Sequence, residues 1–160
     1  MPVKARTRYV KDSRVEMTQL VLPNDTNQLG NLHGGRLMEW IDIAAAISAQ
    51  RHSNRICVTI AVDKLVFHEP IHLGEVVTIR AAVNRSFSTS MEVGVEVLAE
   101  NQLTWKRKLT NTAFLTFVAV DENDRPVKID QIIPQTAEEY VRFKNALGRR
   151  KLRLTQKKYR

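Results

Sequence analysis

The sequence predicts an α+β fold in which an antiparallel β-sheet wraps around one long apolar helix. Three observations lead to this prediction. One helical run follows a polar loop, four strand patterns then follow one another without an intervening helix, and only a short helical segment comes after them. Consecutive strands with short connections pair antiparallel, and an apolar helix needs a sheet to cover it. Such a sheet has open edges that a second copy of the chain could cover.

The first strand is expected to begin near Arg14, after a flexible lead of residues 1–12. Residues 13–22 alternate apolar and polar at Val15 and Met17 and then become apolar, which indicates a strand. The segment that follows, PNDTNQLGNLHGG at 23–35, is dense in turn-forming residues. Its length and polarity predict a functional loop.

A helix of about five turns is predicted from Gly35 to about His52, because apolar residues recur there at intervals of three and four. Asn54 marks its end. Asp42 stands out within this run, since it shares a helix face with Met38 and with small apolar residues. A carboxylate at such a position is costly unless function requires it.

Four strands follow, at 56–68, 76–87, 91–99 and 106–120, where β-branched and aromatic residues recur and largely alternate with polar ones. The segment 69–75 contains Pro70 and Gly74 and is expected to be a turn. Cys57, the one cysteine, is expected to be a buried strand thiol. A short amphipathic helix is predicted at 135–147, before a basic tail at 148–160.

Charge divides the chain unevenly. Residues 141–160 hold nine Lys and Arg and no acidic residue, so they account for the whole net charge of +8. This tail could contact phosphates of a nucleotide, RNA or lipid, or could be a disordered, solvated end. Residues 13–147 are expected to form one domain. With no apolar run of transmembrane length and no signal peptide, the protein is expected to be cytoplasmic.

Several motifs together resemble the acyl-CoA hydrolases (acyl-CoA thioesterases) of the hotdog fold. They are PNDTNQLGNLHGG, the helix with WID followed by AAA, VDKLVFHEPIHLGE, and FLTFVAVD with a following RPV. The resemblance covers residues 15 to about 145. It implies a central helix wrapped by an antiparallel sheet, and homo-oligomers built as trimers of hotdog dimers. The thioester site then lies between two protomers, with acyl-CoA as substrate and CoA as product.

The start of the helix is the predicted oxyanion site. Gly34 and Gly35 allow close backbone approach, and the first N–H groups of a helix have no intrahelical acceptor. The helix dipole also favours negative charge there. We expect the Gly35 N–H, with that of Arg36, to stabilise the oxyanion.

The resemblance assigns two catalytic residues. Asp42 matches the helix carboxylate that acts as general base or nucleophile, although it could be a surface acid paired with Arg36 or Arg51. Asn27 matches an asparagine that the opposite protomer contributes, although it could be a turn residue only.

Other residues are candidates for substrate binding. His33 precedes the glycines and lacks a metal-ligand partner at suitable spacing, so it is expected to pack in the loop or line the substrate site. Val62 and Phe67 could line an acyl channel or belong to the core. Ser88, Thr89 and Ser90 match the family's contacts to CoA, or are ordinary hairpin residues.

The sequence therefore predicts an acyl-CoA thioesterase that hydrolyses fatty acyl-CoA to free fatty acid and CoA, with no metal and no cofactor. No G-x-S-x-G motif is present, so the sequence gives no support for a serine-hydrolase mechanism. A dehydratase of the hotdog fold is a less favoured prediction, because its chemistry needs an acidic residue paired with a histidine and here Asp42 is paired with an asparagine. The alternative is a protein without catalytic activity that binds acyl-CoA or nucleic acid through the basic tail. The tail supports this alternative only by its positive charge.

Overall fold

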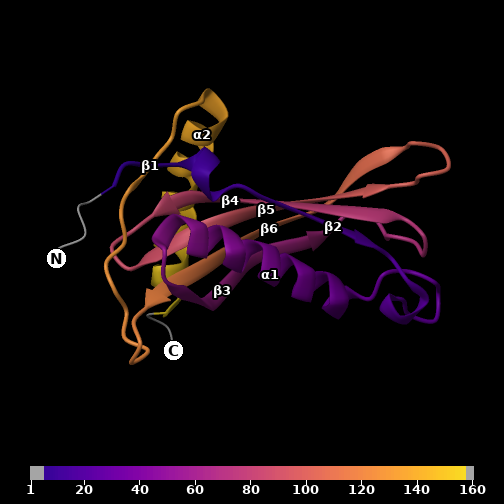
Figure 1. Cartoon of the computed structure of the whole chain (residues 1–160), viewed down its shortest axis with the longest axis horizontal. Helices are drawn as coiled ribbons and strands as arrows, with labels where there is room; N and C mark the ends of the chain where they lie inside the picture. The colour runs from indigo at the N-terminus through magenta and orange to yellow at the C-terminus, as the bar shows by residue number, and fades with distance from the viewer. Residues whose placement is uncertain (1–5, 158–160) are drawn as a thin grey trace.

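The computed structural model describes residues 6–157, and its centre is a five-stranded antiparallel sheet with a helix on each face (Figure 1). The strand order is β2-β4-β5-β6-β3, so β2 and β3 are the edges. The strands are β2 (Val15–Leu20), β3 (Ile56–Phe67), β4 (Val76–Ser86), β5 (Ser90–Glu100) and β6 (Arg107–Val120). Each matches a predicted strand to within two residues at either end, and the predicted sheet is confirmed.

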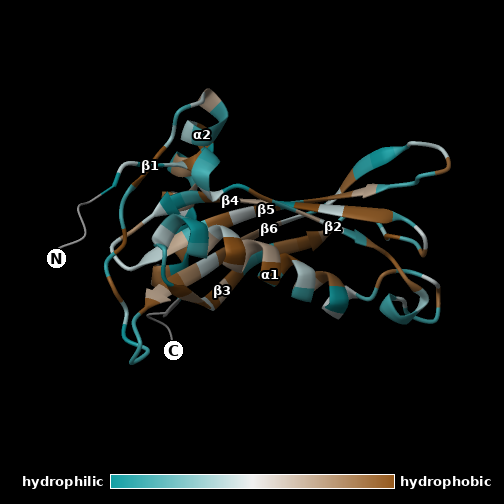
Figure 2. Cartoon of the chain, in the orientation of Figure 1, coloured by the Kyte–Doolittle hydropathy of each residue, from teal (hydrophilic) through white to brown (hydrophobic). Residues whose placement is uncertain are grey.

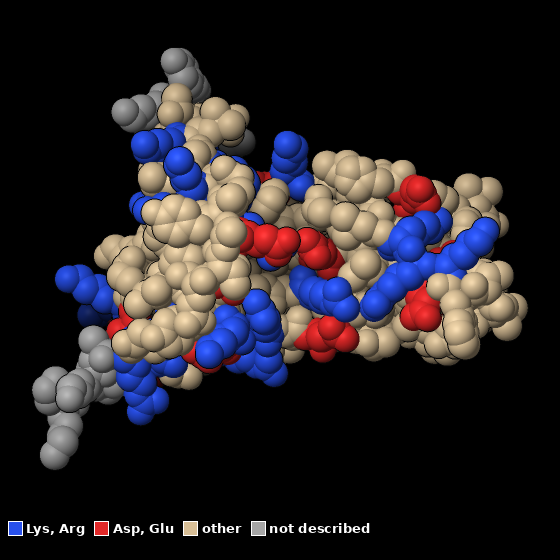
Figure 3. Space-filling view, turned by 90° about the horizontal axis from the view of Figure 1, so that it is seen from above, with Lys and Arg blue, Asp and Glu red and all other residues tan. Residues whose placement is uncertain are grey.

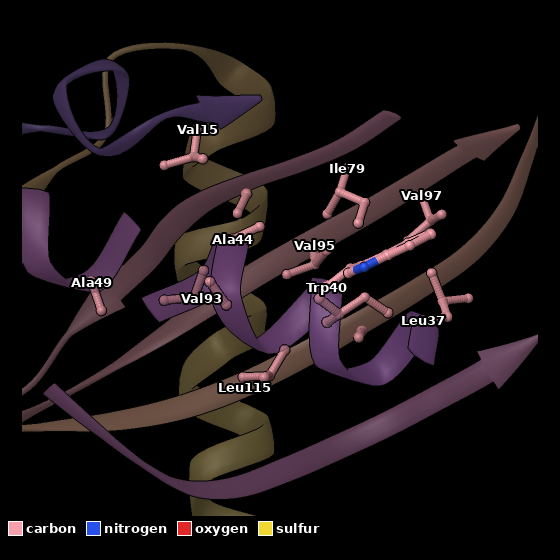
Figure 4. Packing of buried hydrophobic residues seen from close by; sticks show 14 of the residues in the cluster. Val15, Leu37, Trp40, Ala44, Ala49, Ile79, Val93, Val95, Val97 and Leu115 are labelled. Carbon is pink, nitrogen blue, oxygen red and sulfur yellow. The ribbon is translucent and has the colours of Figure 1, made fainter. Parts of the chain in front are cut away.

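Helix α1 (Gly34–Ser53) lies along one face of this sheet, as predicted. Its buried side contains small residues such as Ala44 and Ala49, which let the helix approach the strands closely. Trp40 fills the space nearer its start, over Val95 and its neighbours (Figure 4). Apolar residues therefore concentrate between α1 and the sheet (Figure 2). Asn54 ends the helix in the left-handed conformation, with φ of 53°.

Helix α2 (Ala137–Lys157) crosses the opposite face, and it is longer than predicted. We expected the helix to end at Leu147, but it continues through Gly148 for almost three more turns. A glycine inside a helix costs about 1 kcal/mol relative to alanine, which three ion pairs to the sheet help to offset. These are Arg142–Glu96 at 3.2 Å, Arg149–Glu92 at 2.7 Å and Arg153–Asp63 at 2.8 Å.

The predicted boundary between domain and basic tail therefore falls inside α2. Residues 148–157 belong to the folded unit, and 158–160 lie outside the described residues. On the face shown in Figure 3, Lys and Arg side chains lie interspersed with Asp and Glu.

The amino-terminal lead is also more ordered than predicted. The pair Arg8–Tyr9 forms strand β1, parallel to β7 (Ile132–Ile133), and a 3₁₀ helix spans Val10–Ser13. Val10 is buried in the core, which explains why residues 8–12 are held. Residues 1–5 lie outside the described residues. No helix among residues 6–157 is both long and apolar enough to cross a membrane.

Candidate functional site

Asp42 lies on the side of α1 that faces the edge strand β3. Thr59 of β3 donates its hydroxyl hydrogen to Asp42 Oδ1 at 2.7 Å, and the carboxylate is half-buried. Neither basic residue considered as an alternative partner pairs with Asp42. Arg36 pairs instead with Asp25 at 3.2 Å, and Arg51 donates to the backbone carbonyl of Arg14. Asp42 is thus a carboxylate held by one hydroxyl, with the rest of its accessible surface free to act on a ligand.

The start of α1 presents its backbone donors to an open loop. His33 is the N-cap, and its Nδ1 accepts a hydrogen bond from the Gly35 N–H at 3.1 Å. The Leu37 N–H donates to the His33 carbonyl at 3.1 Å. The Arg36 N–H donates to no atom within residues 6–157. Of the two predicted oxyanion donors, one is therefore capped by an exposed imidazole and the other is free.

The loop before α1 is shaped by side-chain hydrogen bonds. Asn27 Oδ1 accepts from the Leu29 N–H at 3.0 Å and from the Asn31 N–H at 3.3 Å, so Asn27 does serve as a turn residue. Its amide nitrogen makes no hydrogen bond to the described residues, and it remains a free donor. Asp25 is buried and accepts from the Leu22 N–H, as expected for a turn acid. Within one chain, no hydrogen bond joins Asn27 to Asp42, since their side chains bond to Leu29, Asn31 and Thr59 instead.

Val62 and Phe67 are on the surface of this chain and not in its core. They are 44% and 53% exposed. The Phe67 ring lies over Gly34, where a Cβ added to the glycine would be in van der Waals contact with the ring at 3.7 Å. The two residues belong to a set of exposed apolar side chains along α1 and β3. The other members are Met38, Ile43, Ile47, Ile56, Val58 and Ile60.

The hairpin between β4 and β5 carries the three predicted hydroxyl residues. Its backbone is fixed, because the Ser88 carbonyl accepts from Ile129, the Thr89 carbonyl from Ala119 and the Ser90 carbonyl from Phe87. The three hydroxyl groups make no hydrogen bond to the described residues. They are thus available to a ligand at the end of the sheet.

Sequence reasoning missed Thr59. The signal was present, because Cys57 and Thr59 share one face of β3, the face that α1 covers, where they pair with Ala119 and Phe117 of β6. A hydroxyl at such a position, opposite a helix that contains a carboxylate, indicates a partner for that carboxylate. No cluster of three or more metal-ligating side chains is found within residues 6–157.

Comparisons with known proteins identify the family to which this fold belongs. Residues 29–106 match the family model of the thioesterase superfamily. The uncharacterized acyl-CoA thioester hydrolase YkhA of Bacillus subtilis is 40% identical over 153 residues, which cover 96% of this chain and 89% of that protein. Mouse acyl-coenzyme A thioesterase 11 is 44% identical over 146 residues. The chain spans only about a quarter of that protein's length, since the match covers 24% of it.

Solved structures give the same result. The crystal structure of an apo-hexameric acyl-CoA thioesterase superposes with a TM-score of 0.93 and 39% identity, covering 97% of this chain and 99% of that one. The acyl-CoA hydrolase of Staphylococcus aureus, solved with butyryl coenzyme A, coenzyme A and coenzyme A disulfide, has a TM-score of 0.88 and 30% identity, with 96% of each chain covered. Variants of that hydrolase with an aspartate, a threonine or an asparagine replaced by alanine superpose similarly.

Proposed function

Because the chain belongs to the hotdog-fold acyl-CoA thioester hydrolases of the thioesterase superfamily, we propose that it hydrolyses the thioester of fatty acyl-CoA to a free fatty acid and CoA. The hydrogen bond between Thr59 and Asp42 is the observation that carries this proposal. The asparagine, aspartate and threonine replaced in the S. aureus variants are separated by 15 and 17 residues. The same intervals separate Asn27, Asp42 and Thr59.

Asp42 supplies the carboxylate for attack on the thioester carbonyl, as general base towards water or as nucleophile. The Thr59 hydroxyl fixes one carboxylate oxygen and leaves the other oxygen for the reaction. Attack forms a tetrahedral oxyanion, and its collapse breaks the C–S bond so that CoA leaves as the thiolate and then takes up a proton. Water contributes the oxygen of the released fatty acid, either by attacking the thioester carbonyl itself or, where Asp42 is the nucleophile, by hydrolysing the mixed anhydride that the acyl group forms with the carboxylate.

The oxyanion needs donors, and the first turn of α1 supplies them. The free Arg36 N–H is one donor, and the Gly35 N–H becomes the second when the exposed His33 ring turns away from it. The side chain of Arg36 pairs with Asp25 and Glu39, which holds this turn in place. On this proposal His33 is a substrate-lining residue whose hydrogen bond from the Gly35 N–H is replaced by one to the oxyanion.

A second protomer completes the site. Strand β3 is an edge whose outer side pairs with no strand among residues 6–157, and it displays the apolar set that continues onto α1. Pairing of β3 with its copy would bury these side chains and form one continuous sheet across the dimer. Val62 and Phe67 would then line an acyl channel, and Asn27 of one protomer would donate its amide to the site of the other. Further assembly gives a trimer of such dimers.

Release of the CoA thiol from a panel of short to long acyl-CoAs tests the activity. The Asp42→Asn variant is nearly isosteric, so it isolates the chemistry of the carboxylate. We expect a loss of about 10²–10⁴-fold in kcat with the oligomer retained. An absence of turnover on every acyl-CoA by the wild type would refute the proposal.

Mixed oligomers test the shared site. Asp42→Asn and Asn27→Ala chains are each expected to be nearly inactive alone. When they are unfolded together and reassembled, some dimers pair one variant with the other, and one of their two sites is fully intact. Random pairing predicts recovery of about a quarter of the wild-type activity. No recovery would mean that Asn27 and Asp42 act within a single chain, whereas full activity of the Asn27→Ala chain by itself would mean that Asn27 has no catalytic part.

A further inference from the structure

The hairpin between β5 and β6 projects beyond the end of the sheet and carries two apolar side chains into solvent (Figure 1). At its tip, residues 101–107, Leu103 and Trp105 are 96% and 84% exposed. Every residue of this tip is exposed, so no other part of the described chain covers it. Single apolar residues on a surface are ordinary, but two that stand free at one protruding tip indicate a contact surface.

Hydrogen bonds within the tip hold its backbone in place. The Leu103 N–H donates to Asn101 Oδ1 at 3.0 Å, and the Thr104 N–H donates to the Asn101 carbonyl at 3.3 Å. The Asn101 N–H donates in turn to the Lys106 carbonyl at 2.9 Å. These three backbone donors are satisfied without water, which lowers the cost of moving the tip into an apolar medium.

Trp105 has a backbone conformation that is unusual for its residue type. Its φ of 59° lies in the left-handed region, which a bulky side chain enters only at a cost in conformational energy. The indole is so exposed that packing within residues 6–157 offsets little of this cost. An aromatic residue held in this way, without a packing role in the fold, indicates a partner outside the chain.

The hairpin is also basic. Residues 101–109, NQLTWKRKL, contain three cations and no carboxylate. Lys108 pairs with Glu69 at 2.6 Å, whereas Lys106 and Arg107 are exposed and pair with no carboxylate among residues 6–157. The two unpaired cations follow Trp105 directly and give the tip a positive potential. The tip therefore complements an anionic surface.

An anionic lipid surface fits this tip better than a second protein does. A stable protein interface buries about 800 Å² on each partner, whereas a tryptophan buries about 150–250 Å² and only one leucine accompanies it here. Two copies of the chain that met through their tips would also bring like charges together. Tryptophan favours the boundary between lipid and water, where lysine and arginine attract anionic headgroups.

We propose that this hairpin docks the protein on anionic membranes, with Leu103 and Trp105 inserted at the level of the headgroups and Lys106 and Arg107 on the lipid phosphates. Two short apolar insertions give weak, reversible attachment and not a permanent anchor. The hairpin curves away from α1 in Figure 1, so docking does not use the site at Asp42. The inference goes beyond the proposed function and does not depend on it.

Co-sedimentation of the full chain with vesicles tests the proposal. We expect binding to vesicles of phosphatidylcholine and phosphatidylserine in equal amounts, with weaker binding at high salt and on phosphatidylcholine alone. Trp105→Gly suits the left-handed conformation, so it removes the indole without disturbing the turn. This variant and Leu103→Ser should each lower the partition coefficient about tenfold. Lys106→Gln should lower it about fivefold.

Tryptophan fluorescence gives a second readout of insertion. The protein has two tryptophans, and the other one, Trp40, is buried in the core. The emission that disappears in Trp105→Gly is therefore that of Trp105. In the wild type this emission should shift to the blue when anionic vesicles are added, because the indole leaves water.

Two variants on α2 are matched controls. Leu152→Ser removes an exposed leucine and Lys144→Gln an exposed cation, and both should bind vesicles as the wild type does. The proposal is overturned if the wild type does not bind, if Leu103→Ser combined with Trp105→Gly binds unchanged, or if the α2 controls lose as much.

Sedimentation velocity without vesicles checks the other occupant of the tip. The double variant should keep the oligomeric state of the wild type. A change in that state would show that the tip is a contact between copies of this chain and that the assignment to lipid is wrong. No arm of the test uses a thioester, so failure of the proposed function would not be mistaken for failure of the docking surface.

Discussion

The hydroxyl of Thr59 offers the sharpest test of the site chemistry. Thr59→Val replaces the hydroxyl by a methyl group of similar size and removes the 2.7 Å hydrogen bond to Asp42. A hydrogen bond to an ionised group is worth about 1.5–3 kcal/mol. Thr59 is exposed in the single chain, so water can replace part of that bond, and we take about 1.5–2 kcal/mol. The expected loss in kcat is roughly 10–30-fold, at 1.4 kcal/mol for each factor of ten.

Thr59→Ser is the matched control, because it keeps the hydroxyl and loses only the methyl group. Both variants are assayed by thiol release under saturating acyl-CoA, with the oligomeric state and the midpoint of denaturant unfolding measured in parallel. Serine should retain activity within a few-fold of the wild type. If Thr59→Val turns over at the wild-type rate, or if Thr59→Ser is as slow as Thr59→Val, the hydrogen bond does not serve catalysis.

Three predictions concern stability, all read from denaturant unfolding at fixed protein concentration. Arg149→Leu leaves the carboxylate of Glu92, which is 2% exposed, without its cation, and should lower the free energy of unfolding by about 3 kcal/mol. The double variant Glu92→Leu with Arg149→Leu should lower it by less, and an equal loss in both variants would rule out the coupling. Gly94→Ala places a Cβ 2.6 Å from the buried Asn84 amide and should cost about 1–3 kcal/mol, with wild-type stability contradicting that contact. Burial lowers the pKa of His52 below its ordinary 6.5, and the nearby Arg8 lowers it further. The contribution of His52 to the free energy of unfolding should therefore be fully present above pH 6.5 and be lost as the pH falls through the folded-state pKa. A His52→Gln variant with the same pH dependence would exclude His52 as the cause.

Periodicity was sufficient to predict the sheet, because apolar and polar residues largely alternate along the strands even where α2 covers the face opposite α1. The length of α2 was not predictable in that way. Gly148 and the basic residues after it are typical of a chain end, whereas in the structure Arg149 and Arg153 reach Glu92 and Asp63 on distant strands. Propensity is local, and the contacts that extend this helix join residues 57 and 90 positions apart.

The site was predictable in part for the same reason. Asp42 could be identified because a carboxylate on an apolar helix face is conspicuous within a single segment. Thr59 is not conspicuous within a strand, since threonine favours β structure. Only its hydrogen bond to Asp42, 17 residues earlier in the sequence, makes it a candidate site residue. The capping of Gly35 by His33 was also missed. A histidine nitrogen serves as an N-cap acceptor less often than the oxygen of Ser, Thr, Asp or Asn.

The ion pairs of α2 bear on whether the basic segment from residue 148 onwards is a nucleic-acid-binding tail or part of the fold. A nucleic-acid binding tail needs cations that are free to meet phosphates along an extended surface. In α2, Arg142, Arg149 and Arg153 are instead committed to carboxylates of the sheet. Arg150 has no carboxylate partner among the described residues, and its guanidinium lies over the Phe87 ring of the β4–β5 hairpin, 4.2 Å from the ring centroid. The basic segment therefore belongs to the fold through residue 157, as part of α2, and is not a free tail over that length.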